Sequence, residues 1–212
     1  MEKLAGEPSP LEDCLTSFCA QLRNPNRGIS ARAVDEIAAL GPRAIPGIFG
    51  QIESSIKENS PQGFMAAADL IWSLVKIGDD SAVDGLGQYT SKENEDGVRK
   101  FAEWAVKRIG GEKPTLEQAV VDVRSTGFFR PLLGALDLGL IEDENIVLFL
   151  TTTYDHHLPG QREVSPFVRG TVAWALHNHL EQPGVEDKLR VISVNDPDDE
   201  SVKQIADEAL KG

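Results

Sequence analysis

The feature that most constrains the fold is a short sequence phrase that recurs at intervals of 31 to 39 residues. The copies at 29–41 and 98–110 open on a β-branched residue, keep small or apolar residues at helical spacing, and close on an aliphatic-Gly pair. Further copies start at 66, 168 and 202, and a degenerate copy starts at 129. A period between about 20 and 50 residues is typical of a solenoid, whose units bury their apolar faces by stacking on their neighbours.

Each repeat is predicted to form two helices. Within the phrase, Ala33, Ile37 and Leu40 follow the 3.6-residue period of a buried amphipathic helix. A second apolar stretch follows after a short break, at 44–49 in one repeat and 82–86 in another. The sequence therefore predicts an all-α protein of about six helical-hairpin repeats.

Local signals support these helices. Ser60-Pro61 places an N-cap hydroxyl before a proline at the first helical position, and Thr115 with Gln118 has the spacing of a capping box. Residues 191–194 have the composition of a strand, but their position in the repeat fits a second helix. No convincing strand is predicted.

These residues resemble a known family. The run Ile77-Gly78-Asp79-Asp80-Ser81-Ala82-Val83 looks like HEAT repeats, and more narrowly like the short bacterial HEAT-like type also found in phycobilisome lyases. The joint at 196–203 is typical of the same type. The resemblance implies a right-handed α-α superhelix, a HEAT/ARM-like solenoid forming a single domain over residues 9–212 after a flexible tail at 1–8. It implies little about function, because such repeats serve many functions.

The charge balance restricts the class of partner. The chain has 21 Lys and Arg against 34 Asp and Glu, a net charge of −13. A nucleic-acid-binding protein needs cationic surface to displace counterions from phosphate, and no local basic strip is visible. Acidic clusters at 79–80, 93–96, 142–144 and 196–200 fall mostly at joints between helices. They favour helix N-termini and solubility, or they form an acidic ridge that steers a basic partner.

The chain has no apolar run of membrane-spanning length and no signal-peptide pattern, so we expect a soluble cytoplasmic protein without a membrane partner.

The sequence offers little support for catalysis or metal binding. The four histidines are His156, His157, His177 and His179. His177 and His179 lie about 200° apart around a helix, which favours solvated helix-end histidines over a metal site. There is no Gly-rich phosphate loop and no nucleophile elbow. HEAT-type hydroxylases carry repeated His-Glu pairs, whereas this chain has no His-Glu dipeptide. We therefore expect no enzyme activity, no metal and no cofactor.

The resemblance to HEAT arrays implies that the second helices line the concave side. Aligning these helices predicts a concave ridge of partner-binding residues, Gln51, Gln88, Tyr89, Asp122, Thr152 and Tyr154. Amphipathic aromatic residues are enriched at binding hot spots, although tyrosines are also common as half-buried structural residues.

Two functions of different class remain. The leading one is a non-enzymatic scaffold or adaptor that presents an acidic concave helical surface to a partner protein or peptide. The alternative is a chromophore-lyase-like or chaperone-type subunit that acts on a client protein, which co-purification of a tetrapyrrole would favour. The oligomeric state stays open, but an apolar face on the last repeat, at 202–212, is a candidate for self-association or partner docking.

Overall fold

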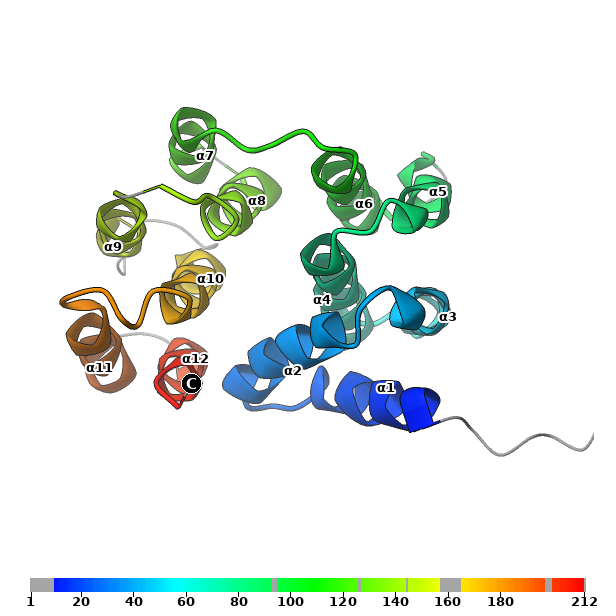
Figure 1. Ribbon diagram of the computed structural model, residues 1–212, viewed down its shortest axis with the longest axis horizontal. Coiled ribbons are helices and arrows are strands. Elements are labelled where there is room, and N and C mark those ends of the chain that lie inside the picture. The colour runs from blue at the N-terminus through cyan, green and yellow to red at the C-terminus, as the bar shows by residue number, and fades with distance from the viewer. Residues whose placement is uncertain are drawn as a thin grey trace, which may run out of the picture. The chain divides into compact units, whose positions relative to one another are not determined.

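The computed structural model of the chain describes residues 10–92, 95–125, 127–143, 145–156, 165–196 and 200–211. Within these residues the protein has twelve α-helices, two short 3-10 helices and no strand (Figure 1). The α-helices are α1 (Pro10–Gln21), α2 (Arg27–Ala39), α3 (Ile45–Lys57), α4 (Pro61–Ile77), α5 (Ser81–Gly87), α6 (Asp96–Ile109), α7 (Leu116–Val123), α8 (Phe129–Leu138), α9 (Ile146–His156), α10 (Ser165–His177), α11 (Val185–Asn195) and α12 (Glu200–Ala209). The 3-10 helices are η1 (Pro42–Ala44) and η2 (Gln88–Thr90). The all-α prediction is confirmed, and residues 191–194 are helical.

The repeat prediction is confirmed at the level of helical hairpins. Each copy of the phrase forms a helix, which gives α2, α4, α6, α8, α10 and α12. A second helix follows each of the first five, which gives α3, α5, α7, α9 and α11. We call these two sets the phrase helices and the second helices.

The predicted helix ends at Ser60, Thr115 and Gly78 are present. The Ser60 hydroxyl accepts a hydrogen bond from the Gly63 N–H at 3.0 Å, and the Thr115 hydroxyl accepts one from the Gln118 N–H at 3.2 Å. Gly78 ends α4 in the left-handed region, at φ 66°, which glycine adopts without the steric cost of a Cβ.

The chain forms two compact units. Unit 1 comprises Met1–Asn24 and Ala33–Gly110, and unit 2 comprises Pro25–Arg32 and Gly111–Gly212. The first residues of α2 thus belong to unit 2 and the rest of that helix to unit 1. The single domain expected over 9–212 stays a prediction, and the expected tail at 1–8 lies outside the described residues.

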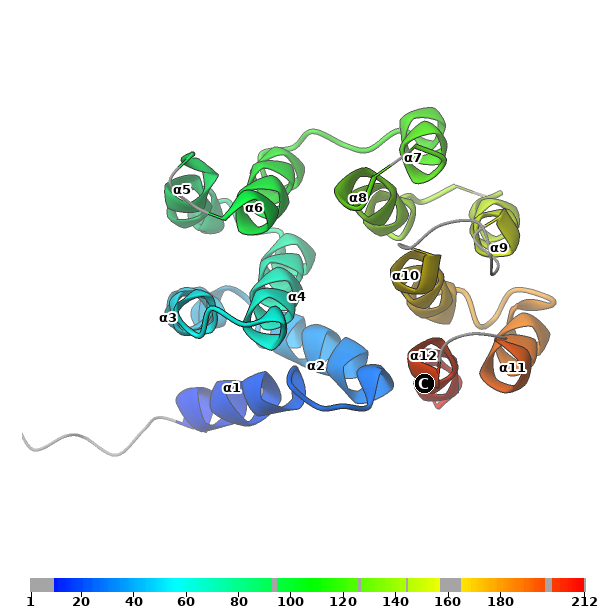
Figure 2. The ribbon, with the colours of Figure 1, turned by 180° about the vertical axis from the view of Figure 1, so that it is seen from behind.

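Unit 1 packs α3 and α5 against α4 and α6 (Figures 1 and 2). Its core includes Ile48 and Ile52, both fully buried. Gly63 allows α4 to approach α3 closely, because a Cβ at this position would lie 2.3 Å from the Ser55 carbonyl oxygen. Trp72 and Trp104 join α4 to α6, with ring centroids 5.5 Å apart.

Unit 2 packs the second helices α7, α9 and α11 against the phrase helices α8, α10 and α12 (Figure 2). Aliphatic and small residues from all six helices form one buried cluster, which includes Leu138, Leu150 and Leu176. The approach of α8 to α7 again depends on a glycine, since a Cβ at Gly134 would lie 2.7 Å from the Val123 backbone nitrogen.

The start of α2 completes unit 2 by packing on α12. A Cβ at Gly28 would lie 2.3 Å from the Gln204 carbonyl oxygen, so the two helices meet at their backbones. The Arg27 N–H donates to Gln204 Oε1 at 3.1 Å, and Arg32 forms an ion pair with Glu208. Part of the last repeat, which the sequence suggested as an open apolar face, is therefore covered by residues of the same unit.

Candidate protein-binding surface

The six residues predicted as a ridge all lie on second helices or on η2, but they differ in exposure. Gln51 on α3 and Asp122 on α7 are half-buried, and Gln88 on η2 and Thr152 on α9 are exposed. Tyr89 and Tyr154 are buried. Gln51, Gln88 and Tyr89 belong to unit 1, and the other three belong to unit 2.

The expectation that Tyr89 lies at a binding surface is corrected. Its side chain is 5% exposed and stacks on Phe49, with ring centroids 6.4 Å apart. Its hydroxyl has no hydrogen-bond partner among the described residues. Burial, with a smaller contribution from the charge of Glu53, raises the pKa of Tyr89 to about 12. Tyr89 is a core residue of unit 1.

The same correction applies to Tyr154, which is 4% exposed. Its hydroxyl donates a hydrogen bond to Asp196 Oδ2 at 2.5 Å. Burial and, after it, this hydrogen bond raise the pKa of Tyr154 above the usual value for tyrosine. The Lys188 Nζ lies 5.0 Å from the centroid of the Tyr154 ring and also binds Asp155 Oδ1 at 2.7 Å.

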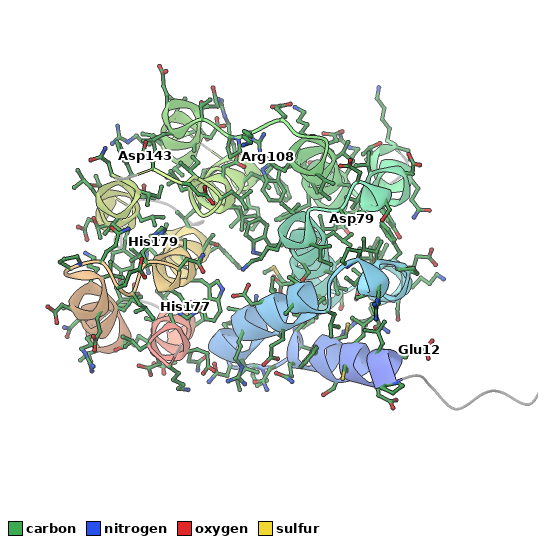
Figure 3. The ribbon with its side chains drawn as sticks, in the orientation of Figure 1. Glu12, Asp79, Arg108, Asp143, His177 and His179 are labelled. Carbon is green, nitrogen blue, oxygen red and sulfur yellow. The ribbon has the colours of Figure 1, made fainter. Side chains whose placement is uncertain are left out.

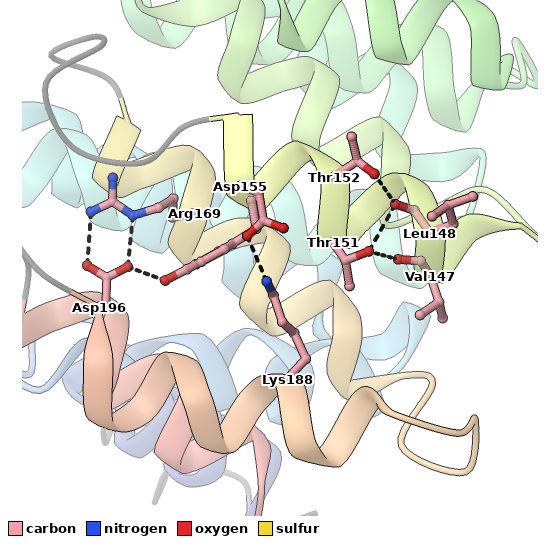
Figure 4. A network of polar contacts seen from close by, with 9 residues as sticks. Val147, Leu148, Thr151, Thr152, Asp155, Arg169, Lys188 and Asp196 are labelled. Carbon is pink, nitrogen blue, oxygen red and sulfur yellow. Dashed lines mark hydrogen bonds and ion pairs between the residues drawn. The ribbon is translucent and has the colours of Figure 1, made fainter.

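Asp196 is the centre of a buried polar network that joins three helices (Figure 4). Arg169 on α10 is 1% exposed, and its Nε and Nη2 donate to the two Asp196 carboxylate oxygens at 2.8 and 3.0 Å. Asp196 follows the last residue of α11, and Tyr154 reaches it from α9. Both charges are thus desolvated together and held in a bidentate pair.

This network corrects the interpretation of the joint at 196–200. Asp196 was expected among acidic residues that favour solubility or steer a partner, whereas its side chain is buried and paired. Both residues stand out in the sequence, Arg169 in the pair Val168-Arg169 and Asp196 in an Asp-Pro joint. Because they lie 27 positions apart, no local pattern predicts that they form an ion pair. The remaining residues 197–199 of that cluster lie outside the described residues.

Sequence reasoning missed a set of exposed aliphatic side chains on unit 2. Val121 on α7, Leu148 on α9, and Val191 and Val194 on α11 are 52%, 64%, 53% and 69% exposed. Thr152 lies one turn after Leu148 on the exposed face of α9. We call Val121, Leu148, Thr152, Val191 and Val194 the aliphatic surface. All five lie on second helices of unit 2.

The hydroxyl groups of α9 add to the apolar character of this surface. The Thr152 hydroxyl donates to the Leu148 carbonyl oxygen at 2.7 Å, and the Thr151 hydroxyl donates to the Val147 carbonyl oxygen at 2.9 Å (Figure 4). Because this donor is already bonded within the helix, the Thr152 side chain offers a partner its methyl group and a hydroxyl oxygen that can only accept.

The aliphatic surface lies on acidic helices. The sequences of α7, α9 and α11 contain five Asp and Glu against two Lys and Arg. Both cations are already paired within this layer, Lys188 with Asp155 and Arg190 with Glu186. By contrast, the phrase helices α8, α10 and α12 contain four Asp and Glu against three Lys and Arg. The second helices of unit 2 thus carry a larger net negative charge than its phrase helices.

Two of the four histidines can be placed with their side chains. His177 Nδ1 lies 2.8 Å from the Ala209 carbonyl oxygen at the end of α12, and the ring stacks on Trp174 (Figure 3). His179 Nδ1 lies 3.4 Å from Gln182 Nε2. His157 and the side chain of His156 lie outside the described residues. Among those that are described, no group of three or more His, Cys, Asp or Glu is positioned to hold a metal ion.

Comparisons with known proteins identify one similar solved structure. No family model matches the chain, and no curated protein sequence matches it significantly. The structure of human deoxyhypusine hydroxylase in complex with glycerol is similar with a TM-score of 0.42 and 17% sequence identity, over 95% of this chain and 96% of that chain.

The matched protein is an enzyme, so the expectation that this chain has no enzyme activity is withdrawn. A similarity of this strength carries no argument about what this chain does. Separately, none of the described helices is both long and apolar enough to span a membrane.

Proposed function

We propose that the protein is a helical-repeat scaffold or adaptor that binds a partner protein or peptide, and that the second helices of unit 2 form the binding surface. The observation that carries this proposal is the aliphatic surface, whose four large aliphatic side chains are each more than half exposed. All four come from the second helices of one unit, and exposed large apolar side chains that gather on one set of helices are candidates for an interaction site.

Two further features support a protein partner. The Arg169–Asp196–Tyr154 network and the aliphatic cluster of unit 2 fix α9, α10 and α11 relative to one another, so the surface loses little entropy on binding. The acidic character of α7, α9 and α11 disfavours nucleic acid, because phosphate would be repelled. A cytoplasmic location remains part of the proposal.

Site-specific photocrosslinking tests this function directly. A benzophenone amino acid is introduced at Thr152, which is exposed on the second helix α9, and in a separate variant at Asp207, which is exposed on the phrase helix α12. Cells expressing each variant are irradiated, and crosslinked products are identified by mass spectrometry.

We expect a discrete crosslinked protein at position 152 that is absent at position 207. The same products at both positions, or none at position 152, would refute a partner on the second helices. The chromophore-lyase alternative has no support from the described residues, and a bilin recovered with the crosslinked client would be needed to restore it.

A further inference from the structure

A short segment at the start of α2 belongs to unit 2 although its neighbours along the chain belong to unit 1. Residues 25–32, which we call the strap, are part of unit 2, whereas Asn24 before them and residues 33–110 after them are part of unit 1. The rest of unit 2 begins at Gly111. The strap is therefore joined directly to unit 1, and it is joined to the rest of unit 2 only through residues 33–110.

The strap packs on α12 through complementary shape and charge (Figures 1 and 2). Gly28 lets the two backbones meet, since a Cβ there would lie 2.3 Å from the Gln204 carbonyl oxygen. Arg32 forms an ion pair with Glu208, whose side chain is 4% exposed. This face of α12 thus has a defined occupant, which is a segment of the same chain.

The strap contributes little apolar surface to this contact. Its buried residues are Gly28 and Ser30, and its one large aliphatic side chain, Ile29, is only half-buried. By contrast, α12 packs on α10 and α11 and has the fully buried residues Val202 and Ala206. Because burial of apolar area supplies most of the free energy of packing, the strap leaves α12 more easily than α12 leaves unit 2.

The connection that leads from unit 1 into the rest of unit 2 has the composition of a hinge. It runs from Gly110 to Thr115, between α6 and α7, and residues 110–113 are all exposed. Gly111 has a φ of 90°, which glycine adopts without the steric cost of a Cβ. Hinges are a few loop residues that absorb changes in φ and ψ, so a change at these two glycines would let a strap reach α12 of another copy.

We propose that two copies of the chain exchange their straps, so that residues 25–32 of each copy pack on α12 of the other. Each exchanged contact has the same atoms as the contact within one chain, so no new interface is required. The Arg32–Glu208 pair places opposite charges at the contact, although each copy has a net charge of −13. Since α12 contributes no residue to the aliphatic surface, strap exchange and partner binding at that surface are independent.

Two complementary charge variants test the exchange. Arg32→Glu places a like charge beside Glu208, and Glu208→Arg places a like charge beside Arg32, so neither variant forms a favourable contact with itself. In a mixture, each strap meets an opposite charge on α12 of the other variant. Light scattering gives the mass of each variant alone and of the equimolar mixture at about 0.1 mM protein.

We expect each variant alone to be monomeric and the mixture to contain a dimer, with a dissociation constant at least about tenfold below that of either variant alone. The wild type should dimerise less readily than the mixture, because its own strap competes for α12. A mixture that stays monomeric, or variants that dimerise alone as readily as together, would overturn the proposal. A wild type that stays monomeric at about 1 mM would overturn it as well.

A steric variant with a matched control locates the contact. Gly28→Ala, added to both charge variants, places a Cβ against the Gln204 carbonyl oxygen and should abolish the mixed dimer. Gly50→Ala is the control, since a Cβ at this exposed position of α3 meets nothing within 4 Å. The control should keep the affinity of the mixed dimer within about twofold. A dimer that survives Gly28→Ala would place the contact elsewhere and contradict the exchange.

Circular dichroism establishes that every variant keeps the helical content of the wild type. Should Glu208→Arg fail to fold, two batches of the wild type are labelled at the exposed Cys14 with donor and acceptor dyes and then mixed. Energy transfer that Gly28→Ala abolishes and Gly50→Ala preserves would support strap exchange. Absence of transfer, or transfer that Gly28→Ala leaves unchanged, would refute it.

Discussion

The same position in the repeat is buried in unit 1 and exposed in unit 2. Counted from the start of each phrase, the twenty-fourth residue is Ile52 or Tyr89 in unit 1, and both are buried. In unit 2 the corresponding residues are Val121, Thr152 and Val191, which are all exposed. The side chain at this repeat position thus packs in the core of unit 1 and lies on the surface of unit 2.

The length of the hairpin connection explains the difference. In unit 1 the second helices α3 and α5 begin 16 and 15 residues after the phrase starts at 29 and 66. In unit 2 α7, α9 and α11 begin 18, 17 and 17 residues after the starts at 98, 129 and 168. Since each residue turns a helix by about 100°, these shifts of one to three residues change which face of the second helix carries the twenty-fourth residue.

The largest effect on stability is expected at the second residue of the phrase, which is Arg99 in unit 1 and Arg169 in unit 2. The two units are expected to differ at this position as well. Arg169→Ala in unit 2 leaves Asp196 buried without its cation, so the free energy of unfolding should fall by about 3–5 kcal/mol. Among the described residues, Arg99 in unit 1 pairs with Asp96 and Glu103 of its own helix, so Arg99→Ala should cost at most about 1 kcal/mol.

Urea denaturation followed by circular dichroism measures both changes. Should Arg169→Ala fail to fold, Arg169→Lys serves in its place, since lysine keeps the charge but loses the bidentate geometry. Equal costs at positions 99 and 169 would show that the two units do not differ at this position.

The next effect concerns the repeat position itself. Ile52→Ala creates a cavity in the core of unit 1 and should lower the free energy of unfolding by about 2–5 kcal/mol. Val191→Ala removes methyl groups that are already in water and should change it by less than about 0.5 kcal/mol. Chemical denaturation of the two variants side by side checks the difference. A cost above about 1 kcal/mol for Val191→Ala would mean that this residue is packed, and would remove it from the aliphatic surface.

The two tyrosines give a smaller contrast. Tyr154→Phe deletes a hydrogen bond to a buried carboxylate and should cost about 1.5–3 kcal/mol. Tyr89→Phe removes a buried hydroxyl without a partner among the described residues, and should leave stability unchanged or raise it slightly. Thermal denaturation distinguishes the two. A clear loss on Tyr89→Phe would reveal that this hydroxyl is hydrogen-bonded after all.

The smallest expected effect is on the ionisation of Tyr89 and Tyr154 at alkaline pH. They are the only tyrosines in the chain. Both have raised pKa values in the folded protein, so absorbance at about 295 nm should stay low at pH 10, where half of an ordinary tyrosine population is ionised. Because the folded state holds the phenolic proton more tightly, the stability that Tyr89 contributes is fully present below pH 10 and is lost as the pH rises towards about 12. Tyr89→Phe should remove the first ionisation step, and a step near pH 10 in the folded wild type would contradict the burial of both rings.

The sequence was sufficient to predict the fold because the phrase has helical spacing within each copy and recurs at a nearly regular interval. The copies at 66 and 98 lie within α4 and α6, and even the degenerate copy at 129 begins at the first residue of α8. Caps such as Ser60 act within one turn, so their partners could be inferred from local spacing.

The proposed binding surface could be predicted only in part. Gln51 and Thr152 were placed on the correct helices, and both are the seventh residue of a second helix, as is Val191. The tyrosines were misplaced because their exposure depends on the register of the second helix, which the phrase does not determine. The partnership of Arg169 with Asp196 depends on how three helices pack, and no local pattern encodes it.

The contact of Gly28 with α12 has a consequence for how the chain is made. Residues 25–32 leave the ribosome well before Gln204 and Glu208, on which they pack. During translation unit 1 can acquire all of its own residues by position 110, but unit 2 must wait for residues 200–209 before its opening segment has a neighbour. Synthesis in the N-to-C direction thus lets unit 1 complete its contacts before unit 2, and Gly28 has no neighbouring helix until α12, which requires it to be a glycine, has been made.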